Sequence, residues 1–132
     1  MMELTNMKII TLCGSLKFQK EMMEIAQSQA LEGICVLTPT YPVLKNIDIT
    51  DKQLNYFKEE HLKRIELSDA ILVVDINKYI GESTNIEIEY AKKLGKEIIY
   101  YSKINKKNKS IFLDKLLDKL LNKNLQLSNK KL

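Results

Sequence analysis

The chain has 132 residues, of which 45% are hydrophobic, and a formal net charge of +4 at pH 7. That length fits one domain with one core, and the hydrophobic fraction is large enough to build it. Arg64 is the only arginine, and much of the basic excess consists of lysines that flank an apolar segment near the C-terminus. Nucleic-acid surfaces usually interleave arginines and aromatic residues on one face. We therefore expect a solvated lysine face and no nucleic-acid partner.

Cysteine use and hydropathy favour a reduced, cytoplasmic setting. Cys13 and Cys35 fall in apolar, strand-like runs without CxxC spacing or a nearby histidine, so they are interpreted as small core residues. The start of the chain lacks the pattern of a signal peptide, and no apolar run approaches the ~20 residues that span a membrane. We expect a cytoplasmic protein with no membrane partner, no metal site and no cofactor.

A strand, a turn and a helix open the chain. Residues 7–13 are short and apolar, and Gly14-Ser15 separates them from an amphipathic segment that reaches about Leu31. Ser15 is placed to cap this helix, whose first turn presents free backbone N–H groups beyond the strand. Gly33 follows as a helix stop, and residues 34–37 are expected to form a second buried strand.

A long loop and a second helix follow. Residues 38–42 contain two prolines and can continue neither a strand nor a helix, so we expect a loop to about Ile49. Thr50 and Gln53 have capping-box spacing, which predicts that a helix opens there. His61 lies on the expected apolar face of that helix, which consists of Leu54, Phe57, Leu62 and Ile65.

The most apolar run of the chain predicts its central strand. Residues 70–74 are uninterrupted by polar side chains, as in a strand buried on both faces, and Asp75 follows at the carboxyl end. A loop of small polar residues then leads into a predicted helix over residues 84–94. Gly95 stops this helix, and residues 98–101 are expected to form a fourth strand.

The helix predicted over residues 84–94 carries an acid on its apolar face. With about 100° of rotation per residue, Glu87 falls within the arc made by Ile86, Tyr90, Ala91 and Leu94. Carboxylates are rarely buried without a partner or a chemical role. Two interpretations stay open: Glu87 is a catalytic carboxylate, or it closes a capping box with Thr84 that stabilises the helix by about 1 kcal/mol.

Alternating strands and helices with short connections predict a doubly wound α/β fold. We expect a flavodoxin-like or Rossmann-like three-layer sandwich with a parallel sheet of four to five strands. Residues 1–121 would form the single domain, because residues 110–121 have a leucine stripe that either covers the sheet or pairs with another subunit. Residues 122–132 would form a polar tail.

Ligands of such folds bind beyond the carboxyl ends of the strands, near the switch in winding direction. The loops around Gly14-Ser15, residues 38–42 and residues 75–84 open onto that edge. Each residue also has a plainer interpretation: His61 as a structural histidine, Asp75 as a turn residue, and Ser83 and Thr84 as helix caps. Lys17 favours an anion nearby, because a cation in the first helical turn otherwise opposes the helix dipole.

Four segments resemble one known family. They are Ile10-Thr11-Leu12-Cys13-Gly14-Ser15-Leu16, Ser68-Asp69-Ala70-Ile71-Leu72-Val73-Val74, Gly81-Glu82-Ser83-Thr84-Asn85-Ile86-Glu87-Ile88-Glu89-Tyr90-Ala91 and Leu94-Gly95-Lys96. Together they resemble the nucleoside 2-deoxyribosyltransferase-like superfamily, which includes the deoxynucleoside 5′-monophosphate N-glycosidases. The resemblance covers roughly residues 7 to 102 in the same order, and it implies the same fold.

The resemblance also implies roles for individual residues. Glu87 matches the glutamate that attacks C1′ of the sugar, and a carboxylate is suited to trap an oxocarbenium-like transition state. The Cys-Gly-Ser loop matches the 5′-phosphate segment, which places Ser15, Lys17 and Ser83 on the phosphate side. The residues expected to contact substrate are Gly14, Ser15, Lys17, Asp75, Gly81, Ser83 and Thr84.

Three departures from the family pattern shift the expected activity. His61 stands where the family commonly has an aspartate, Thr11 replaces a tyrosine, and Gly81 replaces an aspartate of the transferases. A histidine is still able to protonate a departing base or to orient a neighbour. Deoxyribosyl transfer is therefore less favoured than hydrolysis.

We accordingly expect an N-glycosidase-type enzyme that cleaves a nucleoside 5′-monophosphate or related nucleotide, with Glu87 as nucleophile and His61 as general acid or orienting group. The alternatives are a nucleoside 2-deoxyribosyltransferase, a non-catalytic nucleotide-sensing module, and an interaction protein built on its leucine-striped helix. A homo-oligomer is expected, because the stripe is long for this chain and members of the resembled family complete their pockets from a neighbour.

Overall fold

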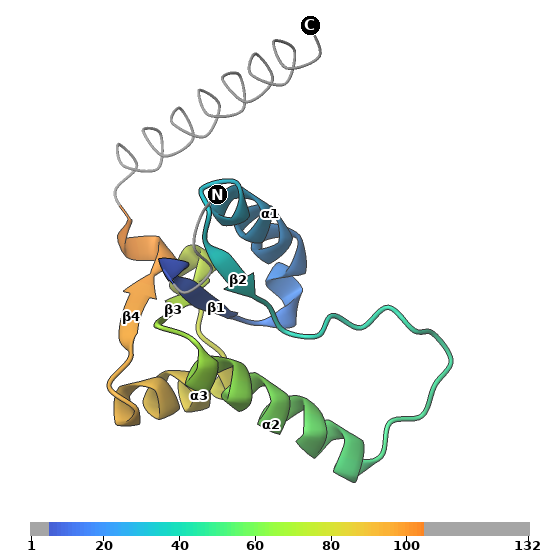
Figure 1. Cartoon of the computed structure of the whole chain (residues 1–132). Helices are drawn as coiled ribbons and strands as arrows, with labels where there is room; N and C mark the ends of the chain where they lie inside the picture. Colours follow the sequence, from blue (N-terminus) through green and yellow to red (C-terminus); the bar gives the residue numbers. More distant parts are fainter. Residues whose placement is uncertain (1–5, 105–132) are drawn as a thin grey trace, which may run out of the picture.

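Four strands form a parallel sheet in the computed structural model, which describes residues 6–104 (Figure 1). Their order across the sheet is β2-β1-β3-β4, and every pairing is parallel. The strands are β1 (Ile9–Cys13), β2 (Cys35–Leu37), β3 (Ala70–Val73) and β4 (Glu97–Tyr100). Since β3 lies in the middle and all its residues are buried, its uninterrupted apolar run is explained.

Helices cover both faces of the sheet. The short 3₁₀ helix η2 (Leu16–Phe18) and α1 (Gln19–Ala30) lie on one face, and α2 (Asp51–Leu67) and α3 (Glu82–Lys93) lie on the other (Figure 1). The chain changes faces where it passes from β2 to α2, so the two central strands, β1 and β3, flank the switch in winding direction. The predicted doubly wound α/β fold is confirmed, with four strands among the described residues.

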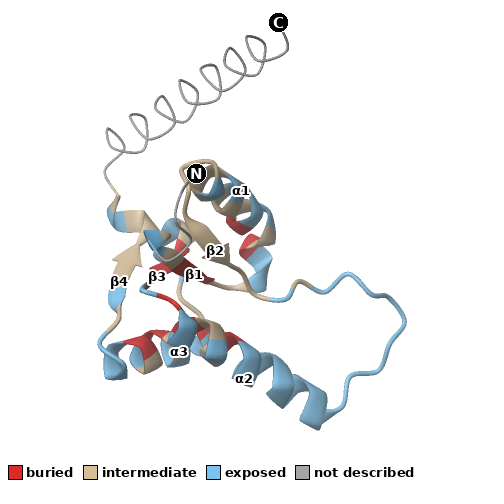
Figure 2. Ribbon diagram, viewed as in Figure 1, coloured by how far each residue is buried: buried red, intermediate tan, exposed pale blue. Residues whose placement is uncertain are grey.

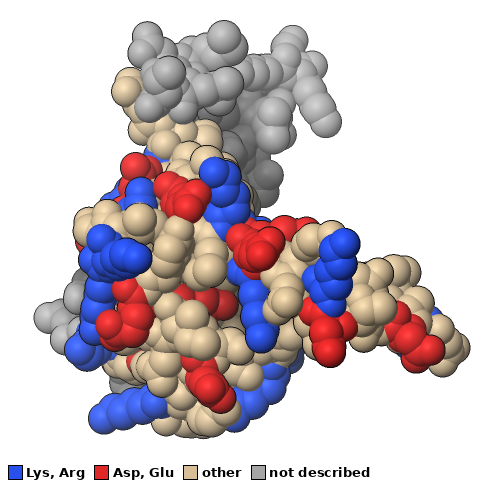
Figure 3. Space-filling model, turned by 90° about the horizontal axis from the view of Figure 1, so that it is seen from below, with Lys and Arg blue, Asp and Glu red and all other residues tan. Residues whose placement is uncertain are grey.

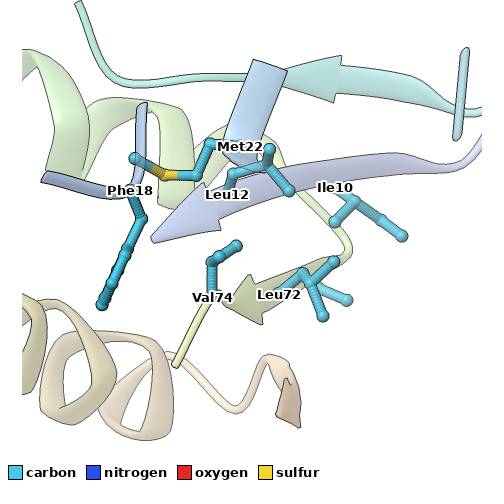
Figure 4. Close-up of a cluster of buried hydrophobic side chains, with 7 residues drawn as sticks. Ile10, Leu12, Phe18, Met22, Leu72 and Val74 are labelled. Carbon is cyan, nitrogen blue, oxygen red and sulfur yellow. The ribbon is translucent and has the colours of Figure 1, made fainter. Parts of the chain in front are cut away.

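The core consists of two apolar layers separated by the sheet. Alternate residues of β3 point to opposite faces, so Leu72 joins one layer and Ile71 joins the other. The α1 layer contains Ile10, Leu12, Phe18, Met22, Ala70, Leu72 and Val74 (Figure 4). The other layer, between the sheet and the helices α2 and α3, contains Cys13, Ile65, Ile71, Val73, Ile88 and Ala91.

The first half of α2 and the loop before it extend away from the sandwich (Figures 1 and 2). The predicted capping box is present, because Thr50 and Gln53 each bond the backbone of the other. We call residues 43–57 the arm. Its large apolar side chains are 42–74% exposed: Val43, Leu44, Ile47, Ile49, Leu54, Tyr56 and Phe57. The predicted burial of Leu54 and Phe57 is therefore wrong, because α2 outreaches the sheet there.

The start of α3 also differs from the prediction. The helix begins at Glu82 with Gly81 as its N-cap and no side-chain cap, and the Asn85 N–H donates to the Gly81 carbonyl. Thr84 thus lies inside the first turn and cannot close a capping box with Glu87. The buried residues of α3 are Thr84, Ile88 and Ala91, whereas Ile86 and Leu94, which were expected on the inner face, are exposed.

The prediction for the end of the chain lies outside the described residues. This applies to the leucine-striped helix over residues 110–121 and to the tail over residues 122–132. None of the helices in the described part combines the length and hydropathy needed to cross a membrane. The face of the molecule in Figure 3 carries basic and acidic side chains interspersed with one another.

Candidate active site

Three elements bring Cys13, His61 and Glu87 together beside the carboxyl end of β1. Cys13 ends β1, His61 lies in the second half of α2, and Glu87 lies beyond the first turn of α3. The distance from Cys13 Sγ to His61 Nε2 is 3.6 Å, and the distance from His61 Nε2 to Glu87 Oε2 is 3.9 Å. The side chains of His61 and Glu87 are only 6% and 17% exposed. We call these three residues the buried cluster.

Packing of α2 on β1 places His61 in this cluster. Ile65, one turn after His61, is fully buried in the layer below the sheet, which turns the same face of α2 inward. The buried Thr11 hydroxyl donates to the Arg64 carbonyl at 3.0 Å. This bond attaches the second half of α2 to β1, whereas Leu54, Tyr56 and Phe57 in its first half are exposed in the described structure.

Packing of α3 on the sheet and on α2 places Glu87. Ile88 and Ala91 are buried below β3 and β1, so Glu87, next to Ile88, faces the end of the sheet. The Tyr90 hydroxyl donates to the Glu66 carboxylate, and Lys96 donates to the Glu66 carbonyl at 3.1 Å. These bonds join α3 and the turn that follows it to the end of α2.

Burial controls the electrostatics of Glu87 and Cys13. It raises the pKa of Glu87 from 4.5 to about 7, and a hydrogen bond with the Cys13 side chain opposes that rise. Burial, and then the neighbouring carboxylate, raise the pKa of Cys13 well above its usual value. Oε2 of Glu87 is buried and has no hydrogen-bond partner among the described residues. The cluster therefore holds a neutral thiol beside a carboxyl group that ionises near neutral pH.

His61 is neutral at pH 7. Burial and the Arg64 guanidinium lower its pKa from 6.5 to about 4, so His61 and Glu87 do not form an ion pair at that pH despite their proximity. With so low a pKa, the protonated form of His61 that could donate to a leaving group is scarce at pH 7. The low pKa of His61 therefore favours its orienting role over the general-acid role.

Two of the predicted phosphate-side residues, Ser15 and Lys17, lie together in the turn after β1. The Ser15 hydroxyl accepts from the Lys17 N–H at 3.3 Å, as expected of a helix N-cap. Lys17 Nζ lies 3.2 Å from the centre of the Tyr79 ring, which attaches this turn to the loop before α3. Gly14 is required for packing, because a Cβ there would lie 3.1 Å from the Val74 carbonyl oxygen.

The remaining predicted residues lie in the loop after β3 and at the start of α3. The buried Asp75 carboxylate accepts from the Ser102 N–H at 2.7 Å and from its hydroxyl at 2.6 Å, so its observed role is to fasten the segment after β4. Gly81 is the N-cap of α3, Ser83 is exposed and Thr84 is buried.

Sequence reasoning missed Cys13, Arg64 and Tyr79 as members of these groups. Cys13 was interpreted as a core residue, which its burial confirms, but its position at the carboxyl end of a central strand was a signal. Arg64 lies one turn after His61, a spacing that places two helical side chains in contact. Tyr79 carried no signal, because its contact with Lys17 depends on how two loops meet.

The buried cluster contains side chains that bind metals, and its three candidate ligand atoms lie within 4.8 Å of one another. A metal at Nε2 requires a lone pair on that nitrogen. However, Arg64 Nη1 lies 3.3 Å from Nδ1 of His61, and a guanidinium has only donors to offer. Nδ1 is then the acceptor, so the ring presents an N–H and not a lone pair to the cluster.

Comparison with solved structures gives matches that include the following two, each at probability 1.00. A 2-desoxiribosyltransferase from Leishmania mexicana matches with a TM-score of 0.52 and 22% identity, over 71% of this chain and 63% of the other. A conserved protein from Enterococcus faecalis V583 matches with a TM-score of 0.54 and 18% identity, over 71% of this chain and 62% of the other. This chain has a nucleoside 2-deoxyribosyltransferase-like fold.

The fold predicted from the resemblance is thus confirmed. No family model matches the sequence, and no curated protein matches it significantly. The aligned part spans less than two thirds of each of these two solved structures.

Proposed function

We propose that the protein is an N-glycosidase-type enzyme that cleaves the N-glycosidic bond of a nucleoside 5′-monophosphate or related nucleotide. Glu87 is the nucleophile in this proposal. The observation that carries it is the position of Glu87: buried, excluded from capping by the start of α3 at Glu82, and with Oε2 free of a hydrogen-bond partner within the described range. A carboxylate held in this way is oriented and has an oxygen lone pair available, as attack on a sugar carbon requires.

The reaction divides into two balanced steps. The ionised carboxylate of Glu87 attacks C1′ while the bond from C1′ to the base nitrogen breaks, and the departing base takes up a proton from solvent. Water then hydrolyses the resulting ester, which returns Glu87 and releases the sugar 5′-phosphate. The first step needs ionised Glu87, and a pKa of about 7 supplies that form at neutral pH and above.

The phosphate side of the proposed site consists of Gly14, Ser15, Lys17 and Ser83. Ser15 and Lys17 follow β1 directly, and Ser83 lies in the first turn of α3, which has no side-chain cap. Backbone N–H groups in a first turn attract anions. In this proposal the phosphate draws Lys17 away from the Tyr79 ring, whose centre lies 3.2 Å from Lys17 Nζ.

Deoxyribosyl transfer is the second candidate, because the Leishmania mexicana structure is described as a 2-desoxiribosyltransferase. In that reaction a second base replaces water in the second step. We favour hydrolysis because Gly81 and His61 replace two acidic residues of the transferase pattern. A nucleotide-sensing module without turnover is the third candidate.

Release of free base is the decisive measurement. Wild type, Glu87→Gln and Glu89→Gln are incubated with a panel of ribo- and deoxyribonucleoside 5′-monophosphates, with and without a second base. Glu89 is a matched control because it is an exposed acid on the same helix. We expect release by wild type and Glu89→Gln and loss of release in Glu87→Gln. New nucleoside formed only with a second base would indicate transfer. No release by wild type, with a nucleotide-induced rise in melting temperature, would indicate sensing.

We also propose that the protein is a homo-oligomer. The apolar side chains of the arm have no surface of their own chain to cover them in the described structure. A contiguous exposed apolar segment of this kind is typical of an interface.

A further inference from the structure

Arg64 determines which nitrogen of His61 carries the proton. Its Nη1 lies 3.3 Å from His61 Nδ1, and its Nη2 donates to the Thr40 hydroxyl at 2.9 Å. A guanidinium has five N–H groups and no acceptor, so the hydrogen between the two side chains belongs to Arg64. A neutral imidazole has a single N–H. With Nδ1 acting as acceptor, that N–H is on Nε2.

The Nε2–H then points into the buried cluster. Cys13 Sγ lies 3.6 Å from Nε2, and a thiol sulfur is able to accept a hydrogen bond as well as to donate one. With the proton on Nε2, the ring donates to the Cys13 sulfur, so this contact is compatible with the tautomer that Arg64 imposes. Since the sulfur receives the His61 hydrogen, its own S–H is directed away from His61 and toward the remaining acceptor, Glu87.

We propose that Arg64, His61 and Cys13 form a directed chain of hydrogen-bond donors that ends on Glu87, with Arg64 as the positioning residue that sets its direction. Each member donates to the next: Arg64 Nη1 to His61 Nδ1, His61 Nε2 to Cys13 Sγ, and the Cys13 thiol to the Glu87 carboxylate. This chain of hydrogen bonds rests on the proposed function only for its purpose, which is to hold the carboxylate for attack on C1′. Its direction holds for any role of Glu87.

The charge states of the surrounding groups agree with this direction. Charged groups face the cluster from α2 (Arg64, with Glu60 3.8 Å from its guanidinium) and from α3 (Glu87), and β1 contributes only the Cys13 thiol. A low pKa keeps His61 neutral and a high pKa keeps Cys13 protonated. Both residues are then able to donate, and the hydrogen bond from Cys13 lowers the pKa of Glu87.

The opposite tautomer would remove the donor at the end of the chain. With the proton on Nδ1, the Nε2 lone pair would attract the thiol hydrogen, and Glu87 would have no donor from Cys13. Arg64 prevents this arrangement, because its N–H and an Nδ1–H of His61 would face each other with their nitrogen atoms only 3.3 Å apart. A polar chain in a buried site has one stable direction when one end offers donors alone.

The tautomer is directly observable, because His61 is the only histidine of the chain. Long-range ¹H–¹⁵N correlation spectra of the full-length ¹⁵N-labelled protein at pH 7 identify the protonated ring nitrogen by its chemical shift. We expect a neutral ring with the proton on Nε2. A proton on Nδ1, or a charged ring, in the wild-type spectrum overturns the proposal without any variant being made.

Two variants test whether Arg64 is the cause. Arg64→Met removes the donor and should shift the ring toward a mixture of tautomers, which moves both ¹⁵N resonances toward their average. Lys63→Met is the matched control, because it removes the same charge from an exposed neighbouring residue whose partner is Glu66. Arg64→Lys should restore the Nε2–H form in part. Unchanged nitrogen shifts in Arg64→Met, or equal shifts in Lys63→Met, contradict the positioning role.

The end of the chain is tested on Glu87 itself. The pKa of Glu87, followed by carboxyl ¹³C shifts, should rise in Cys13→Ala, which has no donor, and stay near the wild-type value in Cys13→Ser, which retains one. Cys35→Ala controls for loss of a cysteine. An unchanged pKa in Cys13→Ala refutes the chain. These spectra need no substrate, so they fail independently of the base-release assay that tests the proposed function.

Discussion

Glu87 and His61 share one buried site, yet burial moves their pKa values in opposite directions, because it disfavours the charged form of each residue. Protonated Glu87 stabilises the fold fully below pH 4.5, and this contribution is lost as the pH rises through about 7. Neutral His61 stabilises the fold fully above pH 6.5, and this contribution is lost as the pH falls through about 4. Between about pH 4.5 and pH 6.5, the stability that Glu87 loses as the pH rises is largely cancelled by the stability that His61 gains.

Replacing one of the two groups should reveal the pH dependence of stability that the other group contributes. A rise in the pKa of Glu87 from 4.5 to about 7 corresponds to roughly 3 kcal/mol of stability lost at high pH. Glu87→Gln, which cannot ionise, should therefore be more stable than wild type at pH 9 by up to that amount, and similar to it at pH 4. Urea unfolding at both values measures the difference. An equal difference at the two values would show that ionisation of Glu87 costs nothing.

The pH dependence of base release should follow Glu87 alone. We expect kcat/KM to rise as the carboxylate ionises, with a midpoint near pH 7. No second transition is expected near pH 6.5, because the pKa of His61 is about 4. An alkaline decline that disappears in His61→Asn would instead restore a general-acid role to His61. The profile is measured from initial rates of base release between pH 5 and 9.

At the scale of elements, the turn after β1 depends on the absence of a side chain at Gly14. An added Cβ would meet the Val74 carbonyl at 3.1 Å and Met22 Sδ at 3.3 Å, and the carbonyl belongs to a buried strand end. Gly14→Ala should therefore destabilise the protein by about 1–3 kcal/mol. Gly81→Ala is the control, because its added Cβ would have nothing closer than 3.6 Å. Urea unfolding that gives equal losses for both would contradict this account.

The capping box of α2 should act locally. Thr50 accepts from the Gln53 N–H at 3.1 Å, and loss of such a cap costs about 1 kcal/mol. Because the first half of α2 has little tertiary support, we expect Thr50→Ala to accelerate amide hydrogen exchange there while the exchange of Ile65 hardly changes. Thr50→Ser should preserve the slow exchange. Uniform acceleration over the whole helix would show that α2 unfolds as one unit.

The elements that sequence patterns predicted well are those with local signals. The run over β3 and the spacing of Thr50 and Gln53 are examples. The start of α3 was misjudged because Thr84 is a better cap than Gly81 by propensity. The loop before it, where Asn77 and Lys78 have positive φ, moves the start of the helix. Periodicity identified the apolar face of α2, but it does not reveal where the sheet ends, so Leu54 and Phe57 were wrongly placed in the core.

The candidate site was predictable in part. Glu87 and His61 were identified separately, and the fold explains why both lie beside the end of β1. Their pairing with Cys13 and Arg64 depends on the packing of α2 and α3 on the sheet. Local sequence patterns do not predict that packing. For the same reason, the use of Asp75 by Ser102, which lies after β4, could not be foreseen.

At the scale of the whole molecule, the arm should mediate self-association. Phe57→Glu places a charge among its apolar side chains and should lower the sedimentation coefficient toward that of a monomer at micromolar concentration. Leu67→Glu is the control, because Leu67 is 58% exposed on the same helix but lies at its other end, outside the arm. A monomeric wild type, or equal effects of both variants, would refute the proposed oligomer.

Thr40 connects the loop before the arm to the buried cluster. It lies in the loop that leads into the arm, and its hydroxyl accepts from the same guanidinium that contacts His61. The proposed association at the arm and the proposed hydrogen-bond chain to Glu87 are thus connected through one guanidinium, and thermodynamic coupling between two such equilibria is reciprocal. The titration curve of Glu87 should accordingly depend on protein concentration, and Thr40→Val should make it independent of dilution.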